Sequence, residues 1–304
     1  MKILVLGHLC LDVIHPAEGP EIQSTGGIYY AVVTLASLAE GRDRVLPVFG
    51  VHEQEHAALV ERLSRYPTVD TSGIFPFREP TNRVHLYYDR RGGRIECSKD
   101  ISAPIPFERI RRFLSADAIL INMISGFDVT LETLDEIRMA IRGENRPVHF
   151  DFHSLTLGTT PSHERHRRPV EEWRRWAFML DTIQLNEEEI AGLPLEPMSD
   201  QQTAGHFLTL GPKGVVVTRG ERGVSLYRND QKRVLRTDVP GIPTDGNAET
   251  TGCGDVFGAG MLWQYVRSGD LLASVEFGNR LAAAKARLRG VDQLSQLRPE
   301  VLPA

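Results

Sequence analysis

The sequence predicts an α/β protein in which a mostly parallel sheet is covered by helices on both faces. Short apolar runs of strand length alternate with longer runs that have helical spacing. Such alternation is typical of β-α-β units, whose crossover helices pack on the sheet. A hairpin pattern around residue 89 lies outside the alternation and predicts a small β lid. The 304 residues, 41% of them apolar, suffice for one large domain.

The first half of the chain contains two predicted strand–helix pairs and the hairpin. We expect strands at 2–7 and 45–49, helices at 28–39 and 53–65, and hairpin strands at 83–88 and 94–97. The first strand is apolar throughout, as expected for a strand that is buried on both faces. We therefore predict one domain, 1–304, with a lid subdomain formed by about 11–25 and 75–103.

The second half continues the alternation. Strands are expected at 118–122, 148–151, 182–185, 214–218, 224–227 and 233–236, and helices at 130–142, 170–179 and, as a pair separated near 268–270, within 254–289. The stretch 157–168 is polar and basic, has no usable period, and is predicted to be a loop.

Charge and cysteine usage exclude several classes of protein. The chain has 35 basic and 40 acidic residues, so its net charge is 35 − 40 = −5, and no basic stripe is present. This argues against nucleic acid or an anionic membrane as the main partner. The cysteines Cys10, Cys97 and Cys253 are far apart, which indicates a reducing compartment such as the cytoplasm. No apolar run is long enough to span a membrane.

The stretch 248–262 carries the strongest functional signal. Gly252 and Gly254 lead into an apolar run with helical spacing, and Asp255 falls in the first turn of that predicted helix. Backbone N–H groups of a small-residue loop and of a helix N-terminus favour bound anions. A carboxylate there is either a first-turn residue that matches the helix dipole or a base beside the anion. A capped buried helix is the alternative.

Other glycine-rich loops fit this stretch poorly. No P-loop run is present, and Phe257 occupies the last position of the dinucleotide fingerprint. The stretch resembles the signature of the ribokinase-like (PfkB) carbohydrate kinase family, Asp-Thr-Thr-Gly-Ala-Gly-Asp, with Glu249 for the first Asp and Cys253 for the Ala. Further positions resemble the family in the same order along the chain: Gly7, Asp12, Gly26-Gly27, Asn186, Glu189, the run 218–223 and the small residues 258–260.

The resemblance implies a three-layer α/β/α sandwich with a mostly parallel central sheet and a β lid over the acceptor. It also implies transfer of the γ-phosphate of ATP to a hydroxyl of a sugar or polyol. Asp255 would take the proton of that hydroxyl, and the N–H groups of Gly252, Cys253 and Gly254 would stabilise the transferring phosphoryl group. A nucleoside acceptor remains an alternative.

The remaining roles implied by the resemblance concern substrate, nucleotide and metal. Asp12, Gly26 and Gly27 would bind acceptor hydroxyls. Thr218, Gly220, Gly223 and Asn279 would bind the nucleotide. Asn186 and Glu189 lie one helical turn apart and would hold Mg²⁺ through water. Each assignment has a simpler competitor, since acidic residues also favour a helix N-terminus and Gly220 and Gly223 also suit a hairpin turn.

Several features of the sequence leave alternatives open. Ala31 stands where the family often has Asn, and Glu249 replaces Asp, so a sugar or nucleoside sensor without turnover competes with the kinase. The run from His52 to His56 formally matches the zinc motif His-Glu-x-x-His. Cys253 beside an anion site would make the enzyme sensitive to thiol alkylation. An exposed lid sheet would favour a homodimer through the lid.

Overall fold

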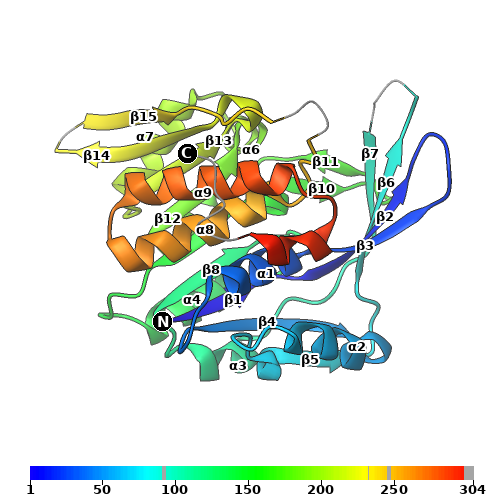
Figure 1. Cartoon of the computed structure of the whole chain (residues 1–304). Coiled ribbons are helices and arrows are strands. Elements are labelled where there is room, and N and C mark those ends of the chain that lie inside the picture. Colours follow the sequence, from blue (N-terminus) through cyan, green and yellow to red (C-terminus); the bar gives the residue numbers. More distant parts are fainter. Residues whose placement is uncertain (91–93, 232, 245–247, 298–304) are drawn as a thin grey trace.

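The computed structural model describes residues 1–90, 94–231, 233–244 and 248–297 and has three layers (Figure 1). Within these residues a nine-stranded sheet runs in the order β15-β14-β13-β12-β9-β8-β1-β4-β5. Every neighbouring pair from β13 to β5 is parallel, and β14 and β15 are antiparallel additions at one edge. The predicted mostly parallel sheet between helices is confirmed. The strand bounds are β1 Lys2–Leu6, β4 Arg44–His52, β5 Ile74–Phe77, β8 Ala118–Asn122, β9 Val148–Asp151, β12 Thr182–Asn186, β13 Gly214–Thr218, β14 Val224–Asp230 and β15 Arg233–Val239.

The helices form layers on the two faces of the sheet. One layer holds α1, α8 and α9, and the other holds α3 to α7, as Figure 1 shows and the packing of neighbouring helices agrees. The helix α2 packs on β4 and β5. The bounds are α1 Ile28–Leu38, α2 Glu53–Ser64, α3 Phe107–Ile110, α4 Leu131–Ala140, α5 Trp173–Phe178, α6 Glu187–Gly192, α7 Asp200–Thr209, α8 Cys253–Ser268 and α9 Leu271–Ala286, with short 3₁₀ helices η1 Thr71–Gly73, η2 Arg111–Phe113, η3 His153–Thr156, η4 Gly220–Arg222 and η5 Val291–Gln296.

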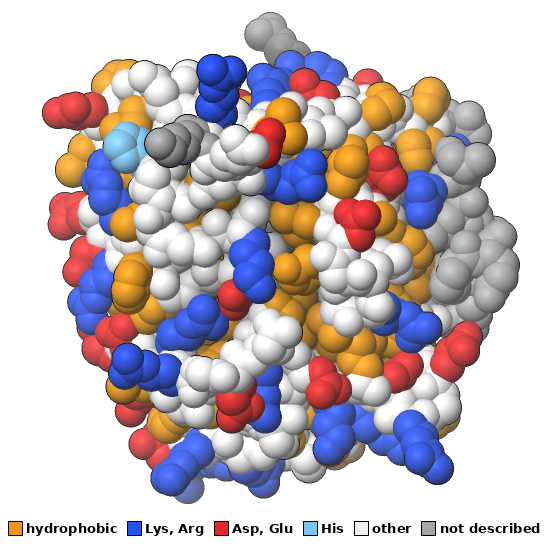
Figure 2. Space-filling view, turned by 90° about the vertical axis from the view of Figure 1, so that its left-hand side faces the viewer, with side chains coloured by type: hydrophobic (Ala, Val, Ile, Leu, Met, Phe, Trp, Pro, Cys, Tyr) orange, Lys and Arg blue, Asp and Glu red, His pale blue; other side chains and the backbone are white. Residues whose placement is uncertain are grey.

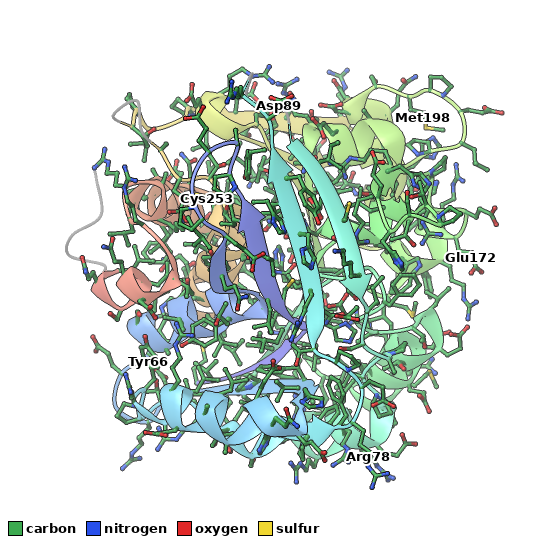
Figure 3. The ribbon with its side chains drawn as sticks, turned by 90° about the vertical axis from the view of Figure 1, so that its right-hand side faces the viewer. Tyr66, Arg78, Asp89, Glu172, Met198 and Cys253 are labelled. Carbon is green, nitrogen blue, oxygen red and sulfur yellow. The ribbon has the colours of Figure 1, made fainter. Side chains whose placement is uncertain are left out.

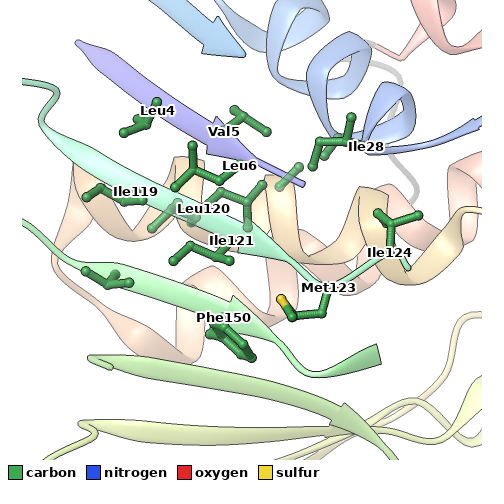
Figure 4. Close-up of a cluster of buried hydrophobic side chains, with 14 of the residues drawn as sticks. Leu4, Val5, Leu6, Ile28, Ile119, Leu120, Ile121, Met123, Ile124 and Phe150 are labelled. Atoms are coloured by element: carbon green, nitrogen blue, oxygen red, sulfur yellow. The ribbon is translucent and has the colours of Figure 1, made fainter. Parts of the chain in front are cut away.

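The core lies on both faces of the central parallel strands (Figure 4). Leu4, Val5 and Leu6 of β1 are fully buried, and so is Ile121 on the neighbouring β8. Each such side chain contributes about 1.5–3 kcal/mol by leaving water. Apolar runs without polar alternation, as in β1 and β8, are what a strand buried on both faces requires. This core fixes the strand ends at which the site is assembled.

The lid is a separate four-stranded sheet with the order β3-β2-β6-β7. Its strands are β2 Leu9–His15, β3 Ile22–Gly27, β6 Asn82–Tyr88 and β7 Arg94–Asp100. Residues 75–77, which the sequence analysis assigned to the lid, lie in β5 and pair with β4 of the main sheet. Part of the turn that we predicted at 89–93 lies outside the described residues.

The basic stretch 157–168 is not the loop that the sequence analysis predicted. It contains two antiparallel strands, β10 Leu157–Thr159 and β11 Arg165–Arg167. The hairpin is joined to the lid, because the Ser98 N–H donates to the carbonyl of His163 at 2.9 Å and Arg165 Nε donates to Ser98 Oγ at 2.7 Å. These strands are only three residues long, and β11 (Arg165–Arg167) has no apolar residue, so they carry no hydrophobic period that a sequence pattern could reveal.

The surface agrees with the charge balance of the sequence. On the face shown in Figure 2, acidic and basic side chains are interspersed. Among the described residues, no helix combines the length and the apolar character that a bilayer crossing requires. The three cysteines are free thiols.

Candidate active site

A cavity of about 490 Å³ lies at the carboxyl ends of the central strands, between the lid and the N-terminus of α8. Figure 3 views the molecule from this side, with the lid strands in front and Cys253 beside them. Ligands of open α/β sheets bind at this edge. Of the residues that the sequence analysis assigned to the site, the following line the cavity: Asp12, Gly27, Asn186, Glu189, Thr218, Gly220, Gly223, Gly252, Cys253, Gly254, Asp255 and Asn279.

The glycine turn before α8 has a left-handed conformation that glycine adopts without the strain of a Cβ. Gly252 is the N-cap of α8 and has φ 79° and ψ −1°, in the left-handed region. A Cβ at this position would lie 2.3 Å from Cδ1 of Tyr30, whose ring is buried in α1. The Cys253 N–H donates to the carbonyl of Thr250 at 3.1 Å and closes the turn. The main chain of the turn is thereby exposed to the cavity.

The small residues behind Asp255 allow α8 to pack closely. A Cβ on Gly258 would lie 2.7 Å from Oε1 of Gln184, and one on Gly260 would lie 2.2 Å from Cδ1 of Leu281. Gln184 in turn donates from Nε2 to the Gly254 carbonyl and to Asp151 Oδ2, both at 3.0 Å. The glycines thus place the first turn of α8 directly over the ends of β9 and β12.

Asp255 lies in the first turn of α8 and faces the cavity. Asn122 at the end of β8 donates from Nδ2 to Asp255 Oδ1 at 2.6 Å, which fixes the orientation of the carboxyl group. Burial raises the pKa of Asp255 above its usual range, although the His153 charge and the Asn122 hydrogen bond oppose that rise. A carboxylate with a raised pKa, held beside a turn of bare amides, suits proton abstraction.

Asp12 faces the same cavity from lid strand β2. Burial, together with the nearby charges of Asp255 and Glu96, raises the pKa of Asp12 to about 6, and a hydrogen bond from Cys10 opposes the rise. Gly26 does not line the cavity but packs against Asp12, since a Cβ there would lie 2.2 Å from Asp12 Oδ2. Gly27, with φ 63°, ends the lid strand and begins α1.

A charged cluster that the sequence analysis missed lies at the end of β9. Asp151 is buried, and burial followed by the Glu189 charge raises its pKa well above the usual range. His153 has φ 32° and a side chain that is 47% exposed and lines the cavity. Partial burial would lower the pKa of His153, but the Glu189 carboxylate, whose Oε1 lies 3.8 Å from His153 Nδ1, and the charges of Asp151 and Asp255 raise it to about 10. The cavity therefore places the His153 imidazole next to the carboxyl groups of Asp151, Glu189 and Asp255, and this arrangement favours a positive charge on His153.

Asn186 and Glu189 form a capping box at the start of α6. The Glu189 N–H donates to Asn186 Oδ1 at 2.9 Å, and the Asn186 N–H donates to Glu189 Oε2 at 2.8 Å. Asn186 Nδ2 also donates to Glu189 Oε1 at 2.7 Å. The two residues therefore cap the N-terminus of α6, as the simpler interpretation of the sequence predicted, and both also line the cavity. Because both Glu189 oxygens already accept hydrogen bonds, contact with a metal through its water shell fits better than direct ligation.

The opposite end of the cavity is a slot lined by main chain and small side chains. Thr218 ends β13, and Gly220 and Gly223, with φ 57° and 93°, begin and end the turn to β14. The facing helix α9 presents Ala282, Ala283 and Ala286. Asn279 donates from Nδ2 to the Pro240 carbonyl at 2.9 Å, so its amide group holds the wall of the slot. The approach 240–247 lies partly outside the described residues.

The histidines of the His-Glu-x-x-His run do not converge. His52 is the N-cap of α2 and its Nδ1 accepts from the Gln54 N–H at 3.3 Å, while His56 Nε2 lies 3.2 Å from the Ile74 carbonyl. Among the described residues there is no group of three or more His, Cys, Asp or Glu side chains arranged to hold a metal ion. The zinc interpretation has no geometric support in this part of the chain.

Sequence reasoning missed Asn122, Asp151 and His153, which all lie at or just after a strand end. The sequence did contain a signal for these residues, because polar residues at the ends of apolar parallel strands meet at one edge of the sheet, where ligands bind. Nothing local distinguished these residues from ordinary loop residues.

Comparison with known proteins agrees with this arrangement. Residues 164–296 match the family described as pfkB family carbohydrate kinase. A cytidine kinase of Thermococcus kodakarensis is 24% identical over 288 residues, which are 91% of this chain and 93% of that protein. A fructokinase of Rhizobium leguminosarum bv. trifolii is 32% identical over 89 residues, only 29% of this chain and 26% of that protein.

Solved structures extend the likeness to the whole fold. The ribokinase of Thermotoga maritima superposes with a TM-score of 0.75 at 21% identity, covering 99% of this chain and 96% of that one. A pyrophosphate-dependent kinase in the ribokinase family has a TM-score of 0.78 at 16% identity and covers 98% of this chain and 100% of that one. The three-layer sandwich with a small antiparallel sheet is therefore the ribokinase-like fold.

Proposed function

We propose that the chain is a member of the ribokinase-like pfkB family of carbohydrate kinases, whose description matches residues 164–296, and that it transfers the γ-phosphoryl group of ATP to a hydroxyl of a sugar or polyol. The observation that carries the proposal is the position of Asp255. Its carboxyl group is oriented by Asn122 and lines the same cavity as the glycine turn and the lid carboxylate Asp12. An acceptor hydroxyl between the two carboxyl groups would meet both its base and the phosphoryl group.

Asp255 would act as the general base. Its raised pKa makes it a better proton acceptor than an ordinary Asp, because proton transfer is most effective when the pKa of the base approaches the working pH. The Asn122 hydrogen bond would keep one oxygen fixed while the proton is transferred. The acid limb of the pH–rate profile should accordingly lie above the pH at which a solvated Asp titrates.

The glycine turn would stabilise the moving phosphoryl group. The Cys253 N–H already donates to the Thr250 carbonyl and closes the turn, so Cys253 would have a structural role. The N–H groups of Gly252 and Gly254 would bind the anion. Phosphoryl transfer depends on positioning and on charge stabilisation, which fixed amides at a helix N-terminus supply. His153 and Arg167, which also line the cavity, would add positive charge.

The slot between α9 and the turn after β13 suits the nucleotide. Gly220, Gly223 and the alanines of α9 leave its walls flat, as an adenine ring requires, and Thr218 lies where the strand ends. Asn279 would act by holding that wall. Mg²⁺ would be held through water by Asn186 and Glu189, and it would neutralise phosphate charge as the bond to the γ-phosphate breaks.

The acceptor would bind under the lid, with Asp12 accepting hydrogen bonds from its hydroxyls. Gly26 and Gly27 would leave room for this contact, the first by packing against Asp12. A nucleoside acceptor is the second candidate, favoured by two observations. The relative that spans most of this chain is a cytidine kinase, and the lid also presents the apolar Val84 and Leu86 to the cavity.

The lid edges support a homodimer. Ile22 on β3 and Ile95 on β7 lie on the two edge strands and are 53% and 51% exposed. The β7 edge is bonded to the 157–168 hairpin at Cys97 and Ser98, so the β3 edge with its apolar Ile22 would be the edge that pairs with another copy. Light scattering after gel filtration would give the mass, and a monomer at micromolar concentration would refute the dimer.

The test of the proposed function is ATP consumption across a panel of sugars, polyols and nucleosides, with binding measured in parallel by calorimetry. Turnover with a sugar or polyol supports the main proposal, and turnover restricted to nucleosides supports the alternative. If an acceptor binds but no panel member is phosphorylated, the protein is a sensor. Asp255 argues against that outcome, since binding alone needs no base.

A further inference from the structure

Lys285 is buried beneath the glycine turn. It lies near the end of α9 and its side chain is fully shielded from solvent. Of the lysines that the structure describes, Lys2, Lys99 and Lys213 are exposed and only Lys285 is buried. Removing an ammonium group from water costs several kcal/mol unless close partners compensate for the lost hydration. Its partners therefore identify what the buried charge does.

The partners of Lys285 belong to the first residue of the signature. Lys285 Nζ donates to the main-chain carbonyl of Glu249 and to Glu249 Oε1, both at 3.2 Å. The other carboxylate oxygen of Glu249 accepts from the Gly290 N–H at 3.0 Å, and the Glu249 N–H donates to the Ala286 carbonyl at 2.9 Å. All of these contacts tie the start of the turn to the end of α9.

The same cation lies next to the aromatic ring under the turn. Lys285 Nζ is 5.8 Å from the centre of the Tyr30 ring, within the range of a cation–π contact. That ring is the group against which Gly252 packs. The Cys253 thiol also donates to the Glu249 carbonyl, at 3.6 Å. Lys285, Glu249 and Tyr30 thus all contact the turn 249–254; Tyr30 also lines the cavity, whereas Lys285 and Glu249 do not.

We propose that Lys285 is a positioning residue for phosphoryl transfer, whose buried charge holds the turn 249–254 in the shape that binds the transferring phosphate. The proposal rests on the function proposed above. It also accounts for Glu249 in place of Asp, because the longer side chain bridges Lys285 and the Gly290 N–H together. The charge is required because a neutral side chain would leave the Glu249 carboxylate without its cation.

Two single variants test the need for the charge. Lys285→Met keeps the length of the side chain but removes the ammonium group, and Lys285→Arg keeps a cation. For Lys285→Met we expect kcat to fall about thirtyfold. This is less than the 10²–10³-fold loss that is typical when an anion-hole donor is removed, because Lys285 acts indirectly. The KM for the acceptor should change by less than about threefold, since Lys285 does not line the cavity. Lys285→Arg should retain more activity than Lys285→Met, and Lys213→Met is the exposed control expected to behave as wild type.

A double variant guards against loss of folding. Glu249→Gln with Lys285→Met removes both charges and so leaves no unpaired carboxylate. It should fold, as judged by circular dichroism, and still show the low kcat.

Lys285→Ala leaves a cavity, and methylammonium added to it should restore at least about a tenth of the lost kcat while leaving the wild-type enzyme unaffected. A merely structural lysine would not respond to a soluble cation in this way.

Hydrogen exchange supplies a readout that needs no activity. In Lys285→Met, amides of residues 248–257 should exchange at least about tenfold faster than in the wild type, with peptides from β1 and β8 unchanged. Wild-type kcat in the folded double variant, or unchanged exchange at 248–257, would overturn the positioning role. If the wild-type enzyme itself turns over no acceptor, the proposed function has failed, and the exchange result still decides whether Lys285 holds the turn.

Discussion

The two walls of the cavity are built by different means. The wall at the glycine turn presents main chain, and its shape is fixed by left-handed Gly252, by Tyr30 beneath it and by the start of α8. The lid wall presents the side chains of Asp12, Val84 and Leu86 from an open sheet. A backbone site depends on small residues in a fixed order, whereas a side-chain site can vary residue by residue. The first wall should therefore determine whether a phosphoryl group is transferred, and the second should determine which acceptor receives it.

The largest effect should come from the base on the first wall. Asp255→Asn should preserve folding and ATP binding but reduce kcat about 10²–10⁴-fold, because the amide cannot accept the proton. Steady-state kinetics with the best acceptor, and ATP titration by calorimetry, measure the two effects. Asp270→Asn is the matched control, because Asn also caps a helix and Asp270 caps α9 from an exposed position. Unchanged turnover in Asp255→Asn would remove this carboxylate from the mechanism.

A smaller but still large effect is expected from the turn itself. Gly252→Ala should reduce kcat on the order of a hundredfold, because its Cβ would meet the Tyr30 ring and displace the amides. Gly269→Ala tests the backbone conformation alone, since Gly269 has φ 68° and a Cβ there would meet no atom within 4 Å. We expect the control to lose only about 1 kcal/mol of stability in urea unfolding and no activity. Equal kcat values for the two variants would mean that the turn has no catalytic role.

Substitution of the lid carboxylate Asp12 should increase the stability of the protein while it weakens function. The pKa of Asp12 is about 6 in the folded protein and 3.8 in the unfolded chain, so the folded state binds the proton more tightly. The free energy of unfolding must then decrease as pH rises from about 4 to 6, and the penalty persists above pH 6. Asp12→Asn removes it and should stabilise the protein by about 1–3 kcal/mol at pH 8 but not below pH 4.

The same variant should weaken acceptor binding. We expect the KM of the acceptor to rise about tenfold, since a charge-assisted hydrogen bond becomes a neutral one. Urea unfolding at several pH values, with acceptor kinetics at pH 8, measures both effects. A variant that is less stable than the wild type at pH 8 would contradict the pKa argument. An unchanged KM would exclude Asp12 from the acceptor site.

The smallest effect should be that of thiol alkylation. Cys253 lines the cavity, but burial raises the pKa of its thiol to about 11, although Lys285 opposes the rise, so little thiolate exists at neutral pH. The structure thus argues against the sensitivity to alkylation that the sequence suggested. Iodoacetamide at pH 7.5 should label Cys253 slowly in the folded protein and readily after guanidinium unfolding, as peptide mass spectrometry can show. Rapid inactivation that ATP prevents would favour the original expectation.

The contrast between the walls also explains what the sequence could predict. The turn and Asp255 are contiguous, and backbone geometry restricts the residue types, so their pattern is visible in one stretch. The alternation of strands and helices likewise follows from local hydrophobic period. Asn122, His153 and Lys285 lie 133, 102 and 30 residues from Asp255 in the sequence, and only the folded sheet brings them together. The basic hairpin at 157–168 gave no period because its strands are only three residues long and β11 has no apolar residue.

That hairpin links the two walls mechanically. Arg165 of β11 donates to Ser98 of the lid, and two residues further on Arg167 enters the cavity, where its Nη1 donates to Thr156 Oγ1 at 2.8 Å. If the lid swings outward, this strand must either follow it or break its bonds to β7. If acceptor entry requires that movement, the positive charge of Arg167 would be displaced together with the lid. The side chain of Arg167 would then be held most firmly when the lid is closed and the bonds between β11 and β7 are intact.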